Sequence, residues 1–208
     1  MQDISLLSDY FPELSKEQLE MFQRFVQVFK EWNQRINLIS RKDVEFIVER
    51  HILHALGISK VVRFLPGAKI LDLGTGGGFP GIPLAVLFPD SHFLLVDSVE
   101  KKIKALTAMV EALQLPNVTT SCVRAESVHE KFDFIVTRAV GDLSKLEEWT
   151  RGKINSKSKH SIPNGIIALK GGYLTGEIEP FKKRVKVFPL TQYFKEPFFA
   201  TKSVVHCT

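Results

Sequence analysis

The chain has 208 residues, of which 44% are hydrophobic and 25% are charged, and its formal net charge at pH 7 is +5. This composition is typical of a soluble globular protein, and the length allows one sizeable core. The sequence contains no run of about 18 or more apolar residues, so no membrane span is predicted. The first residues lack the pattern of a signal peptide. The two cysteines, Cys122 and Cys207, fit neither a disulfide framework nor a structural zinc site, as expected in a reducing cytoplasm. The mild positive charge is compatible with a polyanionic partner.

Residues 1–60 are predicted to be helical. Ser15 and Gln18 have the spacing of a capping box, which satisfies free backbone N–H groups at a helix start. A second helical pattern begins near Asp43 and is expected to stop at Gly57, a usual helix terminator. Apolar residues after the capping box recur at helical spacing and predict one buried stripe: Phe22, Phe25, Val26, Phe29, Trp32 and Ile36.

Beyond residue 60, short apolar runs alternate with amphipathic segments, which predicts an α/β fold with a mostly parallel sheet covered by helices on both faces. After Gly171 and Gly172 we expect an antiparallel strand pair, and a polar, basic stretch at 151–161 is predicted to be an exposed loop. The predicted strands are 69–73, 92–97, 117–123, 132–138, 165–170, 184–190 and 198–207. The predicted helices between them are 81–88, 100–113 and 142–149.

A glycine-rich turn follows the first predicted strand, with five glycines within residues 74–81. Missing side chains let a ligand approach the backbone closely, and open α/β sheets bind ligands at the carboxyl ends of their strands. We therefore expect a ligand at this turn rather than a turn that only packs a helix on a strand. Asp97, at the tip of the second strand, is expected to accept hydrogen bonds from the ribose hydroxyls of that ligand.

The glycine spacing fits two ligands. Gly76, Gly78 and Gly81 match the dinucleotide fingerprint, so a nicotinamide-dependent oxidoreductase stays open. The other spacing, Asp72 followed by alternating glycines from Gly74, is the first motif of class I methyltransferases, which bind S-adenosylmethionine (SAM). We favour SAM, because the Asp72 carboxylate would attract its ammonium group and repel a pyrophosphate. A terminal antiparallel strand pair is also usual for SAM enzymes.

Further motifs stand in a fixed order along the chain: WNQRINLIS at 32–40, ERHILHAL at 49–56, ILDLGTGGGFPGIPLA at 70–85, LLVDSVEKKIKAL at 94–106, VRAE at 123–126, FDFIVTRAVGDL at 132–143 and ALKGG at 168–172. This series resembles the RsmG (GidB) family of bacterial 16S ribosomal RNA guanine-N7 methyltransferases, over nearly the full chain. The resemblance implies a Rossmann-like class I SAM-dependent methyltransferase domain at 61–208, with the helical segment 1–60 packed on it.

The resemblance also implies the reaction and its setting. The expected substrate is a guanine of the 530 loop in 16S rRNA, as free RNA or within the small ribosomal subunit, and the expected methyl donor is SAM. We expect a cytoplasmic monomer with no membrane attachment and no metal. His51 and His54 share a helix face, but two histidines without a third ligand make a poor zinc site.

Several residues receive roles through the resemblance. Arg138, at the end of the fourth predicted strand, is expected to face the reaction centre and act in catalysis. The residues implied for SAM binding are Gly74, Gly76, Gly78, Phe79, Asp97, Ala125, Glu126 and Arg138. Basic residues near the ligand edge of the sheet are expected to contact RNA phosphates: Lys101, Lys102, Arg124 and Lys170.

The chemistry of the implied reaction fits what the sequence lacks. Guanine N7 has a lone pair and no proton, so the transfer needs orientation and electrostatics rather than a general base. The fourth predicted strand is not followed by the Asn/Asp-Pro-Pro-Tyr segment of exocyclic-amine methyltransferases. The sequence also has no Pro-Cys pair, whose cysteine would attack the ring of a pyrimidine substrate. Cys122 is expected to be a small core residue. A small-molecule methyltransferase and a non-catalytic, SAM-binding ribosome-assembly factor stay open as alternatives.

Overall fold

The computed structural model describes residues 4–208. Its helices are α1 (Ser5–Tyr10), α2 (Lys16–Arg35), α3 (His54–Leu56), α4 (Gly81–Leu87), α5 (Glu100–Leu113), α6 (Leu143–Thr150) and α7 (Thr175–Ile178). Its strands are β1 (Lys69–Leu73), β2 (His92–Asp97), β3 (Val118–Cys122), β4 (Phe134–Arg138), β5 (Gly165–Gly171), β6 (Val185–Pro189) and β7 (Lys202–Cys207). The predicted strands at 69–73 and 92–97 and the predicted helix at 100–113 coincide with β1, β2 and α5 residue for residue.

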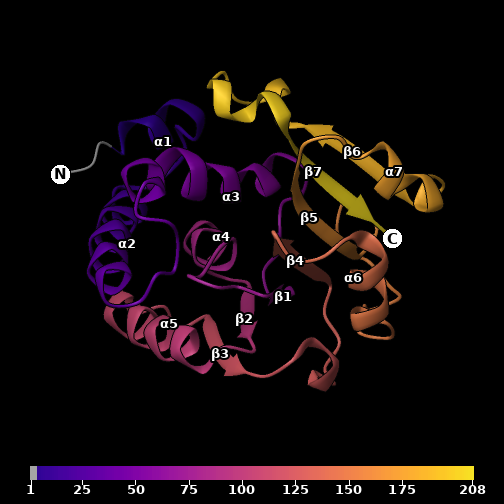
Figure 1. Ribbon diagram of the computed structural model, residues 1–208, viewed down its shortest axis with the longest axis horizontal. Coiled ribbons are helices and arrows are strands. Elements are labelled where there is room, and N and C mark those ends of the chain that lie inside the picture. Colours follow the sequence, from indigo (N-terminus) through magenta and orange to yellow (C-terminus); the bar gives the residue numbers. More distant parts are fainter. Residues whose placement is uncertain (1–3) are drawn as a thin grey trace.

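The strands form one sheet in the order β3-β2-β1-β4-β5-β7-β6 (Figure 1). Strands β1 to β5 are parallel to one another, whereas β7 runs antiparallel to both β5 and β6. The predicted fold class is therefore confirmed, including the antiparallel pair at the end of the chain. The carboxyl ends of β1, β2 and β4 meet at one edge of the sheet, where the sequence predicts a ligand site.

Each face of the sheet has its own hydrophobic core, because successive side chains of a strand point to opposite faces. On one face, Ile70 of β1 packs in a cluster that includes side chains of α2, α4 and α5. On the other face, Leu71 packs in a cluster that includes Leu143 and Leu146 of α6. In Figure 1 the first group of helices lies to the left of the central strands, and α6 and α7 lie to the right.

The N-terminal segment packs on the sheet through α2. The Ser15 hydroxyl accepts a hydrogen bond from the Gln18 amide at 3.2 Å, and the Gln18 side chain accepts one from the Ser15 amide at 3.0 Å, so the predicted capping box is confirmed. Phe22, Phe25 and Phe29 are fully buried and join the core that covers β1. The predicted apolar stripe therefore attaches the N-terminal helices to the sheet.

The second helical segment is less regular than predicted. It runs through a 3-10 turn (Asp43–Phe46), a π-helical stretch (Ile47–Leu53), α3 and a second 3-10 turn (Gly57–Lys60). The α-helical part ends at Gly57 as predicted, but the backbone keeps helical angles there and continues into the second 3-10 turn. Packing explains this glycine, since an added Cβ would lie 2.9 Å from a methyl carbon of Leu190.

The structure also differs from the prediction at α7, at Cys122 and at the start of the last predicted strand, where residues 198–201 form a 3-10 turn before β7. The sequence pattern missed the short helix α7, and Cys122 is exposed rather than in the core, since it ends the edge strand β3.

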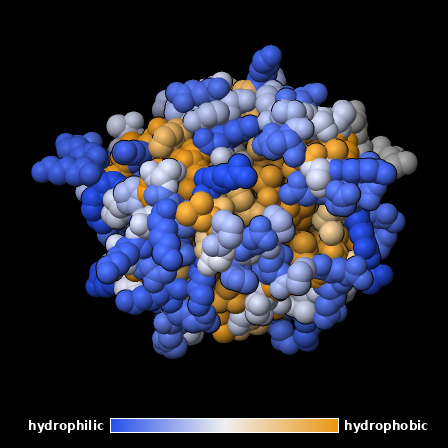
Figure 2. Space-filling view, turned by 180° about the vertical axis from the view of Figure 1, so that it is seen from behind, coloured by the Kyte–Doolittle hydropathy of each residue, from blue (hydrophilic) through white to orange (hydrophobic). Residues whose placement is uncertain are grey.

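Hydrophilic side chains cover most of the face seen in Figure 2, with hydrophobic ones visible between them. Within residues 4–208, no helix combines the length and apolarity needed to cross a bilayer.

Candidate active site

The turn between β1 and α4 is fastened by a buried carboxyl group. Asp72 has no exposed surface, and its Oδ2 accepts hydrogen bonds from the Thr75 hydroxyl at 2.7 Å and the Gly81 amide at 2.8 Å. Burial raises the pKa of Asp72 to about 7. The expected contact between Asp72 and the SAM ammonium group is therefore wrong, because this carboxyl group holds the turn together inside the protein.

Most glycines of the turn are required by packing within the protein. An added Cβ at four of them would press against a neighbouring side chain: Gly74 against Val140, Gly77 against Phe29, Gly78 against Ile82 and Gly81 against Leu95. Gly76 differs from these four, because the nearest atom to its added Cβ is 4.0 Å away; its φ is +56°, and φ is positive at Gly74 and Gly78 as well. Gly76 therefore combines a left-handed backbone with open space for a ligand.

Asp97 ends β2 beside this turn. Its Oδ2 accepts a hydrogen bond from the Gly76 amide at 3.1 Å, and its Oδ1 accepts one from the Val99 amide at 2.9 Å. The Lys102 ammonium lies 3.7 Å from Oδ2. Each carboxylate oxygen has two acceptor positions, so Asp97 is held in place with capacity left for two ligand hydroxyls.

A pocket of about 180 Å³ opens next to Asp97. It brings together four of the residues implied for SAM, Gly74, Asp97, Ala125 and Glu126, although they follow three different strands. The other lining residues are Leu73, Ser98, Arg124, Val140 and Trp149. Apolar walls beside a fixed carboxylate fit an adenine ring and its ribose, and thus fit the nucleoside of SAM. Val140 and Trp149 were not predicted to line it; Trp149 belongs to the amphipathic pattern of a covering helix and carries no sign of a ligand contact.

A wider cleft of about 620 Å³ lies on the other side of the segment after β4. Val140 lines the pocket, whereas Ala139 and Gly141 line the cleft. The cleft holds four cationic side chains, from Arg50, Arg138, Lys170 and Lys202, and two acidic ones. Both acids are ion-paired: Asp43 to Arg50 at 3.2 Å and Glu177 to Lys170 at 2.7 Å.

Arg138 lies at the carboxyl end of β4, within the cleft and next to the segment that separates it from the pocket. Its guanidinium lies 4.8 Å from the centroid of the Phe79 ring and donates one long hydrogen bond, 3.5 Å, to the Arg50 carbonyl. Burial lowers the pKa of Arg138 to about 10, and the charges of Asp72 and Asp43 oppose that shift. Arg138 therefore stays charged at neutral pH with most of its donors open to a ligand.

Two buried histidines line the cleft beside Arg138. Burial, with the charge of Arg138, lowers the pKa of His51 to about 3, and the same two causes lower the pKa of His54 well below its usual value. Both imidazoles are therefore neutral at neutral pH. Within residues 4–208, no cluster of three or more His, Cys, Asp or Glu side chains is placed to hold a metal ion.

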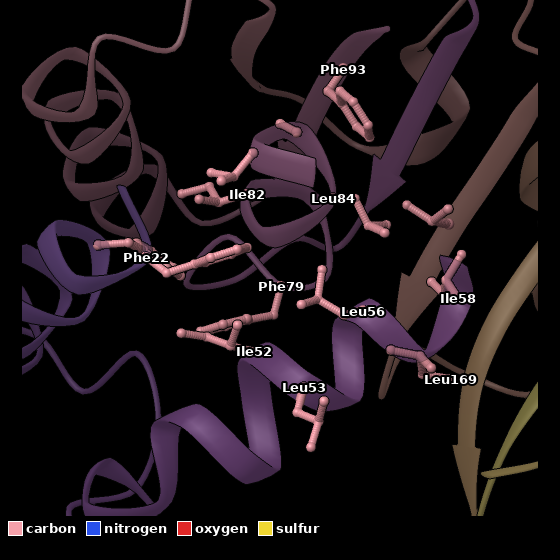
Figure 3. Close-up of a cluster of buried hydrophobic side chains, with 14 of the residues drawn as sticks. Phe22, Ile52, Leu53, Leu56, Ile58, Phe79, Ile82, Leu84, Phe93 and Leu169 are labelled. Atoms are coloured by element: carbon pink, nitrogen blue, oxygen red, sulfur yellow. The ribbon is translucent and has the colours of Figure 1, made fainter. Parts of the chain in front are cut away.

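Phe79 is 2% exposed and packs with its ring centroid 5.4 Å from Phe25, 5.3 Å from Phe29 and 5.2 Å from His51. Figure 3 shows Phe79 inside a hydrophobic cluster, with Ile52 beside it. It lines neither the pocket nor the cleft. Its contact with SAM stays a prediction, and its observed contacts are those of a core residue.

The four residues expected at RNA are spread over different surroundings. Lys101 is exposed on α5, Lys102 lies near Asp97, and Arg124 lines the pocket. Lys170 lines the cleft, where its ammonium pairs with Glu177 and donates to the Gly141 carbonyl at 2.7 Å. Their contacts with RNA stay predictions.

Comparison with solved structures supports the fold. Over 99% of this chain, a mutant of MtNAS in complex with S-adenosylmethionine superposes with a TM-score of 0.59 at 13% identity, covering 78% of that protein. A SAM-dependent methyltransferase from Aquifex aeolicus superposes with a TM-score of 0.56 at 16% identity, over 77% of this chain and 91% of that one. At these identities the likeness concerns the fold alone.

Sequence comparison goes further. The family model GidB, described as rRNA small subunit methyltransferase G, matches residues 18–202. A protein of Porphyromonas gingivalis named ribosomal RNA small subunit methyltransferase G is 50% identical over 97% of this chain and 91% of its own length. A protein of the same name from Bacteroides fragilis is 48% identical over 99% of this chain and 100% of its own length. The chain therefore belongs to the GidB family of SAM-dependent methyltransferases of small-subunit ribosomal RNA.

Proposed function

We propose that the chain transfers the methyl group of SAM to N7 of a guanine in the 530 loop of 16S rRNA. The observation that carries the choice of N7 is the lack of a free base in the cleft. Both carboxylates that line it are ion-paired, and both histidines are neutral with strongly lowered pKa values. A nitrogen with a lone pair and no proton suits such a cleft, because nothing has to remove a proton.

In this proposal the pocket holds the nucleoside part of SAM. Asp97 binds the two ribose hydroxyls, Ala125 and Glu126 contact the adenine edge, and the open side of Gly76 faces the methionine part. When bound, SAM supplies an electrophilic methyl group on a sulfonium. The family assignment favours this ligand over the dinucleotide that the glycine spacing left open.

The target base enters from the cleft. In-line transfer needs the acceptor nitrogen about 3 Å from the methyl carbon and opposite the sulfur. Arg138, next to the boundary between pocket and cleft, orients the base by donating hydrogen bonds to O6 and leaves N7 free. A base in this position has to be unstacked, which is how sequence-specific RNA recognition usually proceeds. We further propose that the protein acts as a monomer in the cytoplasm.

Mapping the modified base tests the proposal. Small-subunit particles from a strain that lacks this gene are incubated with SAM and the purified protein. N7-methylguanine is then located by borohydride reduction, aniline cleavage and primer extension. We expect one new stop, in the 530 loop. Transfer to an exocyclic amine or to another loop would contradict the proposal, and SAM binding without any transfer would support the assembly-factor alternative instead.

A further inference from the structure

Two aromatic side chains stand out on the surface. Phe46 is 43% exposed and Tyr173 is 105% exposed, and they are the only aromatic residues among the exposed large hydrophobic side chains of residues 4–208. Aromatic rings usually bury most of their area, so full exposure of Tyr173 leaves an apolar surface in water. Both residues belong to segments that border the cleft.

Phe46 is the last residue of the 3-10 turn Asp43–Phe46. Asp43 before it and Arg50 after it in the chain both line the cleft. The Arg50 guanidinium carbon lies 3.8 Å from the centroid of the Phe46 ring. A cation placed over a ring at this distance is attracted by the π-electrons and also limits the motion of the long side chain. Phe46 and Arg50 therefore form one surface at the rim, where the Arg50 guanidinium contacts both the Phe46 ring and, at 3.2 Å, the Asp43 carboxylate.

Further aromatic and cationic side chains follow Arg50 along the lining of the cleft. The Arg50 guanidinium carbon lies 5.7 Å from the centroid of Phe198, and the Lys202 ammonium lies 4.9 Å from the same centroid. Phe198 and Lys202 both line the cleft. Aromatic and cationic side chains therefore alternate along these contacts, in the order Phe46, Arg50, Phe198 and Lys202.

Tyr173 lies on a different border of the same cleft. It belongs to the loop between β5 and α7, and Gly171 and Glu177, on either side of it in the chain, both line the cleft. Since nothing covers Tyr173, its ring is open to a partner at the mouth. The aromatic row and Tyr173 thus come from segments far apart in the sequence.

Alternating aromatic rings and cations are the chemistry that binds single-stranded nucleic acid, because bases stack on rings while cations neutralise phosphates. We infer that the row of Phe46, Arg50, Phe198 and Lys202, together with Tyr173, stacks the unpaired nucleotides that flank the methylated guanine. The inference rests on the proposed function, since that function places the target base in this cleft. It names the side chains that hold the neighbouring bases, which include none of the lysines predicted from the sequence.

The test measures the affinity of wild-type protein and variants for unmethylated small-subunit particles by filter binding, with SAM affinity measured separately by calorimetry. Tyr173→Ile removes the aromatic face and keeps an apolar side chain, whereas Tyr173→Trp keeps a stacking face. Because Tyr173 is fully exposed, neither change disturbs packing. Phe46→Leu tests the other border of the cleft. Leu65→Ala serves as the control: Leu65 is also exposed, at 39%, but it precedes β1 and so lies near the amino-terminal ends of the strands, away from the cleft.

We expect Tyr173→Ile and Phe46→Leu each to raise the dissociation constant for the particle by about tenfold, near the low end of the effect of one stacked base. Tyr173→Trp and Leu65→Ala should bind like the wild type, and SAM affinity should stay unchanged throughout. Wild-type affinity of both Tyr173→Ile and Phe46→Leu would overturn the inference, as would a failure of the wild type to bind the particle. Weakened binding of these two variants supports it even if no methyl group is transferred, and in that case only the proposed function fails.

Discussion

The pocket beside Asp97 and the cleft beside Arg138 meet at the segment after β4, yet they are built from different parts of the chain. The pocket is lined mainly by residues that follow β1, β2 and β3, in the order in which these strands stand in the sheet. The cleft is lined by residues from 43–54, 138–141, 169–177 and 198–202. The pocket is therefore formed mainly by strand ends and the turns after them, whereas the cleft forms where segments far apart in the sequence pack together.

This difference separates two tasks. In the pocket, Asp97 is fixed by two backbone amides, so the binding geometry depends on the fold of a few residues. In the cleft, Asp43 and Glu177 are fixed by ion pairs with side chains of their own segments, Arg50 and Lys170, and the cleft forms only where these segments pack together. We infer that the pocket suits a ligand shared by many enzymes of this fold, whereas the cleft can change with the substrate while the sheet stays the same.

The largest effect is expected where the two regions meet. Arg138→Met keeps a long apolar side chain against Phe79 but removes the guanidinium, and we expect turnover on saturating particles to fall by about a hundredfold. The resemblance also implied Arg138 for SAM binding, but we expect SAM affinity to change little, because Arg138 lines the cleft and not the pocket. Single-turnover kinetics and calorimetry measure the two quantities. A parallel fall in melting temperature and turnover would mean that Arg138 is structural.

A change inside the pocket should have the opposite signature. Asp97→Ala removes the acceptor expected to bind the ribose, and we expect SAM affinity to fall by about 1–3 kcal/mol, measured by calorimetry. Lys102→Ala is the matched control, because it removes an ion pair at 3.7 Å and leaves the carboxylate in place. Unchanged SAM affinity of the Asp97 variant would refute the placement of the ribose.

The cleft also gives a pH-dependent prediction. The pKa of His51 is lowered to about 3, from an ordinary value of 6.5, so the neutral imidazole stabilises the fold above pH 6.5 and this contribution is lost as pH falls towards 3. The slope is at most about 1.4 kcal/mol per pH unit. His51→Leu should therefore lose less stability than the wild type between pH 6.5 and 5, as measured by urea unfolding.

The pH dependence of the His51 variant has to be compared with that of the wild type, because Asp72 changes the stability with pH in the opposite direction. Its pKa is raised to about 7, so its contribution favours the folded state at low pH and is lost as pH rises towards 7. That contribution is common to both proteins and cancels in the difference. Equal pH slopes for the His51 variant and the wild type would show that His51 is not the group that titrates.

The sequence predicted the pocket better than the cleft for a physical reason. Gly74, Asp97, Ala125 and Glu126 follow strands whose apolar runs are plain in the sequence, and parallel strands bring their carboxyl ends together. The strand positions, the covering helices 81–88, 100–113 and 142–149, and the antiparallel end were predicted from patterns of the same kind. Local patterns place the strand ends, whereas the role of Ala125 and Glu126 came from the family resemblance.

The cleft depends on contacts that no local pattern contains. Asp43 and Arg50 lie well over a hundred residues before Lys170 and Glu177 in the chain, and the irregular helical turns between Asp43 and Lys60 set the directions of the Asp43 and Arg50 side chains. Tyr173 and Phe46 carry no local sign that they stay exposed. Asp72 shows the same limit inside a well-predicted motif, since its burial follows from the turn closing over it and not from its neighbours in sequence.

The smallest expected effect tests what the glycines of the turn are for. Gly76→Ala places a methyl group in open space, and its φ of +56° costs about 1 kcal/mol of stability for a residue with a side chain. Gly78→Ala has a similar backbone cost and also presses on Ile82, so it should lower the melting temperature more. If a ligand occupies the space beside Gly76, SAM affinity should fall further in Gly76→Ala than in Gly78→Ala, although Gly78→Ala is the less stable protein. Calorimetry at a temperature where both variants are folded decides this. An order of SAM affinities that follows stability would mean that all the glycines of this turn serve packing and that the methionine part of SAM lies elsewhere.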